Sequence, residues 1–133
     1  MSNIIATIVD IKNCDSLNIV EFTFCNQSLS MMSLELNNKI KIGSKVRLSI
    51  KSTNIAISKD FISNISFENR LKCKILSIEN GELLSSVTIE IGNTTLEVIL
   101  TKQSVKNMNL NINDEVLAFI NMSELSISEI IND

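Results

Sequence analysis

Histidine, tryptophan and tyrosine are absent from this chain of 133 residues, and its five phenylalanines are its only aromatic side chains. Without histidine, the chain lacks the side chain that most often performs acid–base catalysis and most often binds metal ions. Proteins that bind single-stranded nucleic acid usually stack the bases on aromatic side chains beside a basic groove. Because this chain has 4% aromatic residues and a net charge of −3, we expect no direct binding of nucleic acid.

Long hydrophobic runs are also missing. No apolar run approaches the ~18 residues that a membrane-spanning helix needs, so no contact with a membrane is expected. The first residues lack the basic flank, apolar stretch and cleavage site of a signal peptide, which predicts a cytoplasmic protein. Cys14, Cys25 and Cys73 are odd in number and match no paired metal-binding spacing. We therefore expect reduced thiols and no metal site.

The chain does contain an internal repeat. Residues 40–58 align without a gap on residues 110–128, a shift of 70 positions. Identical residues stand at Ile42, Val46, Ile50, Ile57 and Ser58 and recur at Ile112, Val116, Ile120, Ile127 and Ser128. Before this segment, residues 3–11 resemble 69–77 with a shift of 66, and 19–24 resemble 86–91 with a shift of 67. The repeat predicts two related units, residues 1–62 and 63–133.

Strands dominate the local pattern of both units. Short runs of branched apolar residues alternate with polar ones, as in Val46, Leu48 and Ile50. Turns are expected at the Asn80-Gly81 and Gly92-Asn93 pairs. Five short strands per unit predict an all-β protein with one short helix per unit, folded as two tandem, OB-like, five-stranded Greek-key barrels.

One predicted helix starts at Thr101, directly after an expected strand. The Thr101 hydroxyl is a good N-cap, because it can accept a hydrogen bond from a backbone N–H two or three residues later. Helix starts attract anions, and the hydroxyls of Thr101 and Ser104 would lie on one side of such an anion. The alternative is an ordinary cap with Ser104 facing solvent, and the spacing alone favours this alternative.

The second unit carries an ordered series of segments with a known counterpart. In chain order they are Asn69–Ile75, the hairpin Ile78–Glu82, Val87–Ile91, Thr101-x-x-Ser104, Asp114–Val116 and Ile120–Ser123. This series resembles the Mop domain, a TOBE domain of the molbindin type, and residues 43–57 of the first unit resemble its end. The resemblance implies a non-enzymatic di-Mop protein that binds molybdate or tungstate and needs no cofactor. It also implies a homo-oligomer, a dimer or trimer, with the oxyanion at unit or subunit interfaces.

Six residues match the elements that bind the oxyanion in this family. They are Thr101 and Ser104 of a Thr-x-x-Ser element, Lys51 and Ser52 of a Lys–small-residue element, and Ser66 and Asn69 of a Ser-x-Arg-Asn element. Glu68 stands where the family often has arginine, and its carboxylate would repel a dianion. Asn121 stands where the first unit has Lys51. The resemblance therefore predicts two units that differ in binding.

Three functional hypotheses follow. The first is an intracellular protein that binds molybdate, tungstate or both for storage, homeostasis or sensing. The second is a TOBE-type structural or regulatory interaction module that has lost or weakened oxyanion binding, which the carboxylate of Glu68 favours. The third is a small OB-type enzyme or nucleic-acid binder, which the missing histidine and the scarce aromatic residues disfavour.

Overall fold

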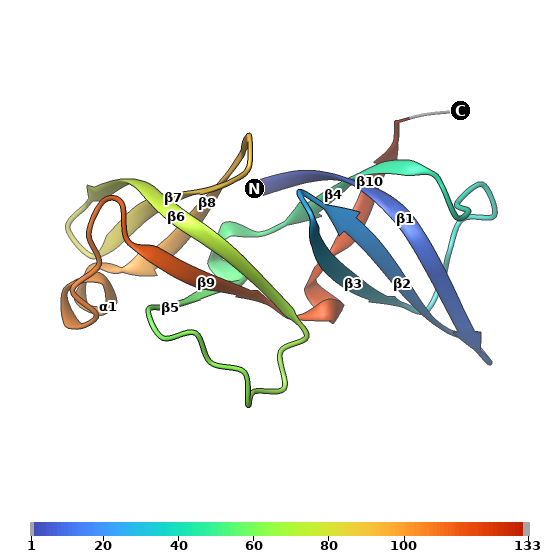
Figure 1. The fold of residues 1–133 in the computed structure, drawn as a ribbon, viewed down its shortest axis with the longest axis horizontal. Helices are drawn as coiled ribbons and strands as arrows, with labels where there is room; N and C mark the ends of the chain where they lie inside the picture. Colours follow the sequence, from blue (N-terminus) through green and yellow to red (C-terminus); the bar gives the residue numbers. More distant parts are fainter. Residues whose placement is uncertain (1, 132–133) are drawn as a thin grey trace.

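The computed structural model describes residues 2–131, and within them the chain forms ten strands and one α-helix. The strands are β1 (Ser2–Cys14), β2 (Leu17–Phe24), β3 (Gln27–Ser33), β4 (Lys45–Ile50), β5 (Ile55–Ser58), β6 (Asn69–Asn80), β7 (Leu84–Ile91), β8 (Thr94–Thr101), β9 (Glu115–Ile120) and β10 (Ser126–Ile130). They form two five-stranded sheets, in the orders β10-β4-β1-β2-β3 and β5-β9-β6-β7-β8. The two sheets lie side by side along the longest axis of the molecule (Figure 1).

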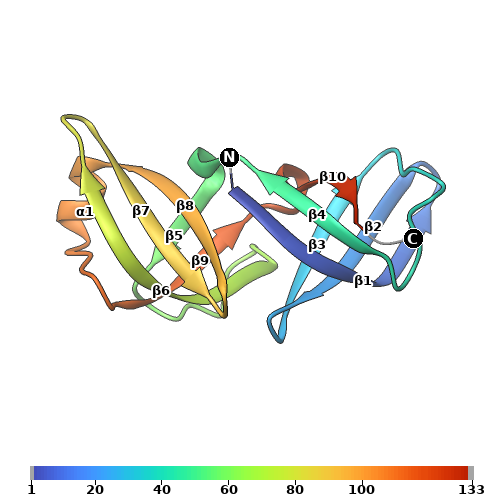
Figure 2. The same ribbon diagram turned by 90° about the horizontal axis from the view of Figure 1, so that it is seen from above.

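Alternating burial explains why these segments form strands. In β2 and β7, every second side chain is buried, with Phe22 and Ile89 among the most enclosed. Both sheets are strongly curved (Figure 2), and their buried side chains form one continuous core. The edge strands β5 and β8 of the second sheet lie close to each other, as barrel closure requires. The predicted all-β fold with two OB-like, five-stranded units is confirmed.

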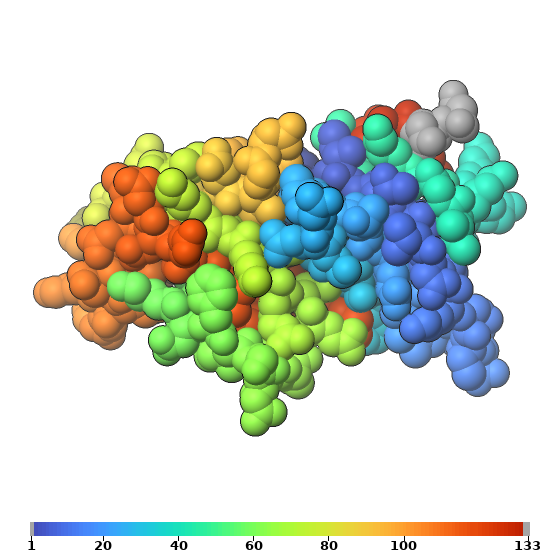
Figure 3. All heavy atoms as spheres, in the orientation of Figure 1, coloured from blue at the N-terminus to red at the C-terminus, as the bar shows by residue number. Residues whose placement is uncertain are grey.

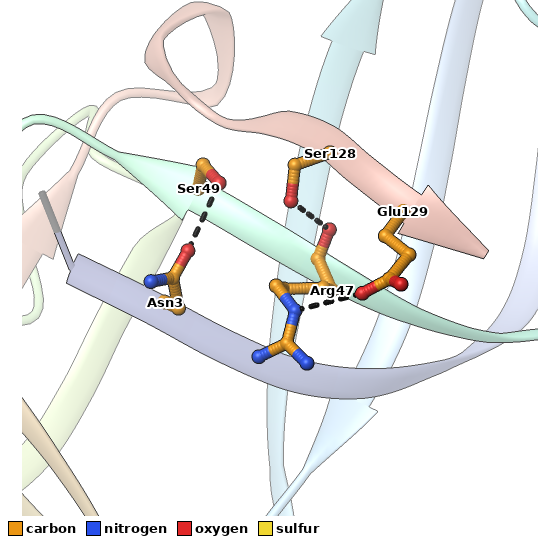
Figure 4. A network of polar contacts seen from close by, with 5 residues as sticks. All are labelled: Asn3, Arg47, Ser49, Ser128 and Glu129. Atoms are coloured by element: carbon orange, nitrogen blue, oxygen red, sulfur yellow. Dashed lines mark hydrogen bonds and ion pairs between the residues drawn. The ribbon is translucent and has the colours of Figure 1, made fainter. Parts of the chain in front are cut away.

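Each sheet takes one edge strand from the other half of the chain. β5 pairs with β9, where Ile55 lies opposite Ile120. β10 pairs with β4, where Ile127 lies opposite Leu48. The hydroxyl of Ser128 donates to the Arg47 carbonyl at 3.2 Å, and the Arg47 guanidinium pairs with Glu129 at 3.0 Å (Figure 4). The division into residues 1–62 and 63–133 stays a prediction about the sequence, because both sheets cross it.

The strand registers give the alignment of the two halves. Ser2 pairs with Ile50 in the first sheet, and Asn69 pairs with Ile120 in the second. Because Ile50 and Ile120 are counterparts, Ser2 corresponds to Asn69, a shift of 67. The expected shift of 66 for residues 3–11 is therefore wrong by one residue. It would have aligned Ile5, which is 47% exposed, with the fully buried Leu71, and a one-residue slip moves every side chain to the other face.

The short helices differ between the halves. Helix α1 (Lys102–Asn107) follows β8. The structure describes every residue of the matching segment 34–44, between β3 and β4, and that segment contains no α-helix. The helix expected in each unit is thus found once. The shift between the halves rises from 67 to 70 across this segment, so the first half has three residues fewer in which to form it. Each half also has one 3-10 turn, η1 (Ser52–Asn54) and η2 (Met122–Glu124).

None of the helical segments within residues 2–131 has the length and hydrophobicity needed to cross a membrane.

Candidate functional site

Thr101 and Ser104 form a local pair of hydroxyls at the start of α1. Thr101 ends β8 and caps the helix, with its Oγ1 accepting from the Ser104 N–H at 3.0 Å. The Thr101 hydroxyl also donates to Ser104 Oγ at 2.9 Å. Val105 is buried in the core and fixes the helix against the sheet. The predicted N-cap is confirmed, and Thr101 is exposed while Ser104 is half-buried.

Two exposed leucines lie beside this pair. Leu84 is opposite Thr101 in the β7–β8 ladder, and the Leu83 carbonyl accepts from the Lys102 N–H at 2.9 Å. The side chains of Leu83 and Leu84 are 79% and 54% exposed. The hydroxyl pair therefore adjoins an apolar surface.

Asn69 lies at the start of β6 and is almost fully buried, with 1% exposure. Its Oδ1 accepts from the Ser30 N–H at 2.7 Å, and its Nδ2 donates to the Ser30 carbonyl at 2.8 Å. The side-chain amide thus acts like a backbone partner for β3 and joins the two sheets. Ser66 and Glu68 are exposed in the segment that precedes β6.

Lys51 and Ser52 lie at the other junction of the sheets. Lys51 is exposed and precedes η1, whereas Ser52 is 7% exposed. The Ser52 hydroxyl is 3.3 Å from Ser2 Oγ and donates to Glu97 Oε1 at 3.5 Å. This contact brings the first half of the chain against β8 of the second half.

Glu97 was not among the predicted site residues. Ser2 holds its backbone, because Ser2 Oγ donates to the Glu97 carbonyl at 2.9 Å and accepts from the Glu97 N–H at 3.0 Å. Ser86 donates to Glu97 Oε2 at 2.7 Å. With Ser52 on the other oxygen, the Glu97 carboxylate receives hydrogen bonds from two serines. Ser52 is 45 residues away from Glu97 in the sequence, so no local sequence pattern predicts this contact.

The six predicted residues lie in three separate pairs within one chain. Among residues 2–131, no hydrogen bond or ion pair links Thr101 and Ser104 to the Lys51–Ser52 pair or to the Ser66–Asn69 pair. None links those two pairs to each other either. Across that same range, no three His, Cys, Asp or Glu side chains gather closely enough to hold a metal ion. A surface hollow of about 1120 Å³ lies between residues 37–44 and 127–130, and none of the six residues lines it.

The three cysteines are free thiols. Cys14 and Cys25 are exposed, whereas Cys73 lies in the core, where burial raises the pKa of its thiol to about 12. Thiolates, not thiols, are nucleophiles and metal ligands. Cys73 is therefore a packing residue at neutral pH.

Comparisons with known proteins match both the second half and the whole fold. The TOBE domain model matches residues 65–127. A probable molybdenum-pterin-binding protein of Haemophilus influenzae is 36% identical over 64 residues, which are 47% of this chain and 93% of that protein. The fold is similar to the crystal structure of the cytoplasmic molybdate-binding protein ModG with molybdate bound. The TM-score is 0.89 at 19% identity, over 97% of this chain and 95% of that one.

Proposed function

The chain belongs to the TOBE-domain (Mop) family, and from this premise we propose that it is a non-enzymatic, cytoplasmic protein that binds molybdate. One observation carries the proposal. The segment shared with the TOBE model and with the molybdenum-pterin-binding relative contains the accessible hydroxyl pair of Thr101 and Ser104. The names of both similar proteins describe binding rather than catalysis.

The donors of the three pairs suit a tetrahedral dianion. Hydroxyl and N–H groups that donate to an ionised partner contribute about 1.5–3 kcal/mol each, so the net charge of −3 is no obstacle to binding. In this proposal the Thr101 and Ser104 hydroxyls turn toward the anion, and Lys51 supplies a positive charge. Tungstate has the same shape and charge as molybdate, and we include it among the proposed ligands.

Assembly into a homo-oligomer, a dimer or trimer, follows from the separation of the three pairs. A complete site would combine pairs from different copies of the chain, because no hydrogen bond or ion pair joins the three pairs within residues 2–131 of one copy. The exposed Leu83 and Leu84 beside Thr101 support an interface at this position, since adjoining apolar side chains favour burial against a partner. Storage, homeostasis and sensing of the oxyanion are the roles that such a protein would serve.

Two carboxylates favour the alternative, an interaction module with weakened oxyanion binding. Glu68 is exposed next to Asn69, and Glu97 lies at Ser52. Each would repel a dianion at its own pair. This alternative predicts assembly of the protein without measurable binding of molybdate.

Calorimetric titration with molybdate, tungstate and sulfate tests the proposal. We expect binding of molybdate and tungstate, and Thr101→Val should weaken it at least tenfold, about 1.4 kcal/mol, because one hydroxyl donor is lost. Thr101→Ser restores the hydroxyl and should recover most of the affinity. Thr95→Val, at an exposed threonine of the same strand, is the matched control and should bind normally. Absence of heat with both metal oxyanions would overturn the proposal.

A further inference from the structure

Glu97 places a carboxylate at the pair that the family resemblance assigns to oxyanion binding. Its two oxygens accept hydrogen bonds from Ser52, at 3.5 Å, and from Ser86, at 2.7 Å. Ser52 follows Lys51 directly at the start of η1. The carboxylate therefore uses the same kind of donors that a bound oxyanion would use, and one of these donors, Ser52, directly follows Lys51 in the sequence.

The other half of the molecule shows what this corner looks like without a carboxylate. With the shift of 67, the counterpart of Glu97 is Ser30. Ser30 lies opposite Glu21 in the β2–β3 ladder, as Glu97 lies opposite Thr88 in the β7–β8 ladder. Asn69 bridges the N–H and carbonyl of Ser30 just as Ser2 bridges those of Glu97. The link between the sheets thus uses only the backbone at this position. The carboxylate of Glu97 is not needed to form it.

The remaining counterparts differ in a consistent way. With the shift of 70, Lys51 and Ser52 correspond to Asn121 and Met122. The carboxylate that accepts hydrogen bonds from serines lies at the corner with Lys51 and the buried Ser52 hydroxyl. The cation, the buried hydroxyl and this carboxylate therefore occur together at one junction of the sheets, and uncharged residues stand at the three matching positions of the other half.

We propose that Glu97 is an internal competitor that weakens oxyanion binding at Lys51–Ser52. The carboxylate occupies the hydroxyls of Ser52 and Ser86, and its negative charge repels a divalent oxyanion that approaches Lys51. Binding requires that the anion displace the Glu97 side chain from both serines. Glu97 thereby sets the affinity of any site that includes this pair, and this inference rests on the proposed function.

The test compares Glu97→Gln and Glu97→Ser with the wild-type chain by calorimetric titration with molybdate. Glutamine keeps the size of the side chain without its charge, and serine reproduces Ser30 of the other half. Both variants should bind at least tenfold more tightly than wild type. The gain should shrink as salt is raised toward ~1 M, where charges are screened beyond about 3 Å, whereas a purely steric effect would not depend on salt. Glu79→Gln, at an exposed residue of β6, has the same change in net charge and should bind as wild type.

The outcomes separate this inference from the proposed function. If wild type binds molybdate and both Glu97 variants bind with the same affinity, the inference is wrong and the proposed function stands. If wild type shows no heat and a Glu97 variant binds, the inference is supported and binding by the natural chain is refuted. If Glu79→Gln strengthens binding as much as Glu97→Gln, the effect is one of net charge and the inference is wrong. If neither the wild type nor any variant binds molybdate, both the inference and the proposed function are wrong.

Discussion

At the scale of single residues, Asn69 stabilises the contact between the two sheets, a role that its sequence motif does not indicate. Its buried amide makes both hydrogen bonds to the backbone of Ser30. Asn69→Ala should lower the free energy of unfolding by about 1–3 kcal/mol, because it leaves a buried N–H and carbonyl of Ser30 without their partner. Urea denaturation followed by circular dichroism measures the change.

Ser66 provides the matched control for Asn69. It is exposed in the same predicted element, so Ser66→Ala should change the free energy of unfolding by no more than ~0.5 kcal/mol. Equal urea midpoints of unfolding for Asn69→Ala and wild type would show that the hydrogen bonds from Asn69 to Ser30 contribute nothing to stability.

Cys73 gives a prediction that depends on pH. Its folded-state pKa of about 12 lies above the ordinary value of 9.0, so the folded chain holds this proton more tightly than the unfolded chain. The stabilisation is complete below pH 9 and is lost as the pH rises toward 12. At pH 8, iodoacetamide should modify the exposed Cys14 and Cys25 and spare Cys73, as counted by mass spectrometry. In urea all three should react, and rapid modification of Cys73 in the folded protein would contradict its burial.

Local chemistry explains which site residues could be predicted. Thr101 and Ser104 are three residues apart, and a capping pattern of that length is visible in any sequence. Glu97 could not be predicted in this way, because its partners Ser2 and Ser52 come from the other half of the chain. Such contacts depend on how the sheets pack, which local propensity does not encode.

At the scale of elements, the exchanged strand β10 makes a testable contribution to the first sheet. A chain that ends at Leu125 lacks β10, which leaves the backbone of β4 unpaired and removes Ile127 and Ile130 from the edge of the core. We expect a lower thermal unfolding temperature for this truncated chain. A synthetic peptide of residues 126–133, added in excess, should raise it again by mass action.

A peptide of the same composition in scrambled order is the control for this rescue. It keeps the charge and mean hydropathy but loses the order in which Ile127 lies opposite Leu48 and Ile130 opposite Val46. The register irregularity between Ile127 and Glu129 places these two isoleucines on the same side of β10. Equal stabilisation by both peptides, or an unchanged unfolding temperature after truncation, would show that β10 does not hold the sheet.

Strand positions were predictable, whereas strand partners were not. The alternation of Val46, Leu48 and Ile50 marks β4 from the sequence, since period-two burial is a local signal. Nothing in Ile55–Ser58 or Ser126–Ile130 tells which sheet each strand joins. The prediction of a helix in the first half was wrong for a related reason. The three residues that the first half lacks prevent a helix only because the strands on either side are fixed in space.

At the scale of the whole molecule, the two halves meet through paired contacts of their counterparts. Asn54 of η1 donates to Glu124 of η2 at 2.8 Å, and these residues are 70 positions apart. The hairpin at Cys25 touches the hairpin at Gly92, with the Cys25 thiol 3.6 Å from the Ile91 carbonyl. In the space-filling view the two halves adjoin without a separating cleft on the visible face (Figure 3). The repeat in the sequence predicted similar units, and the structure adds the approximate twofold relation between them.

The exchange of β5 and β10 also governs how the protein is made. A ribosome adds about 5–20 residues per second, so roughly 4–14 s separate the synthesis of β5 from that of β10. During this interval β4 has no partner on its outer edge, and open strand edges are prone to pair with other chains. The first sheet is incomplete when its own half has been translated, whereas the second sheet has all five strands once β9 has been made. Final folding therefore waits for the last strand to leave the ribosome.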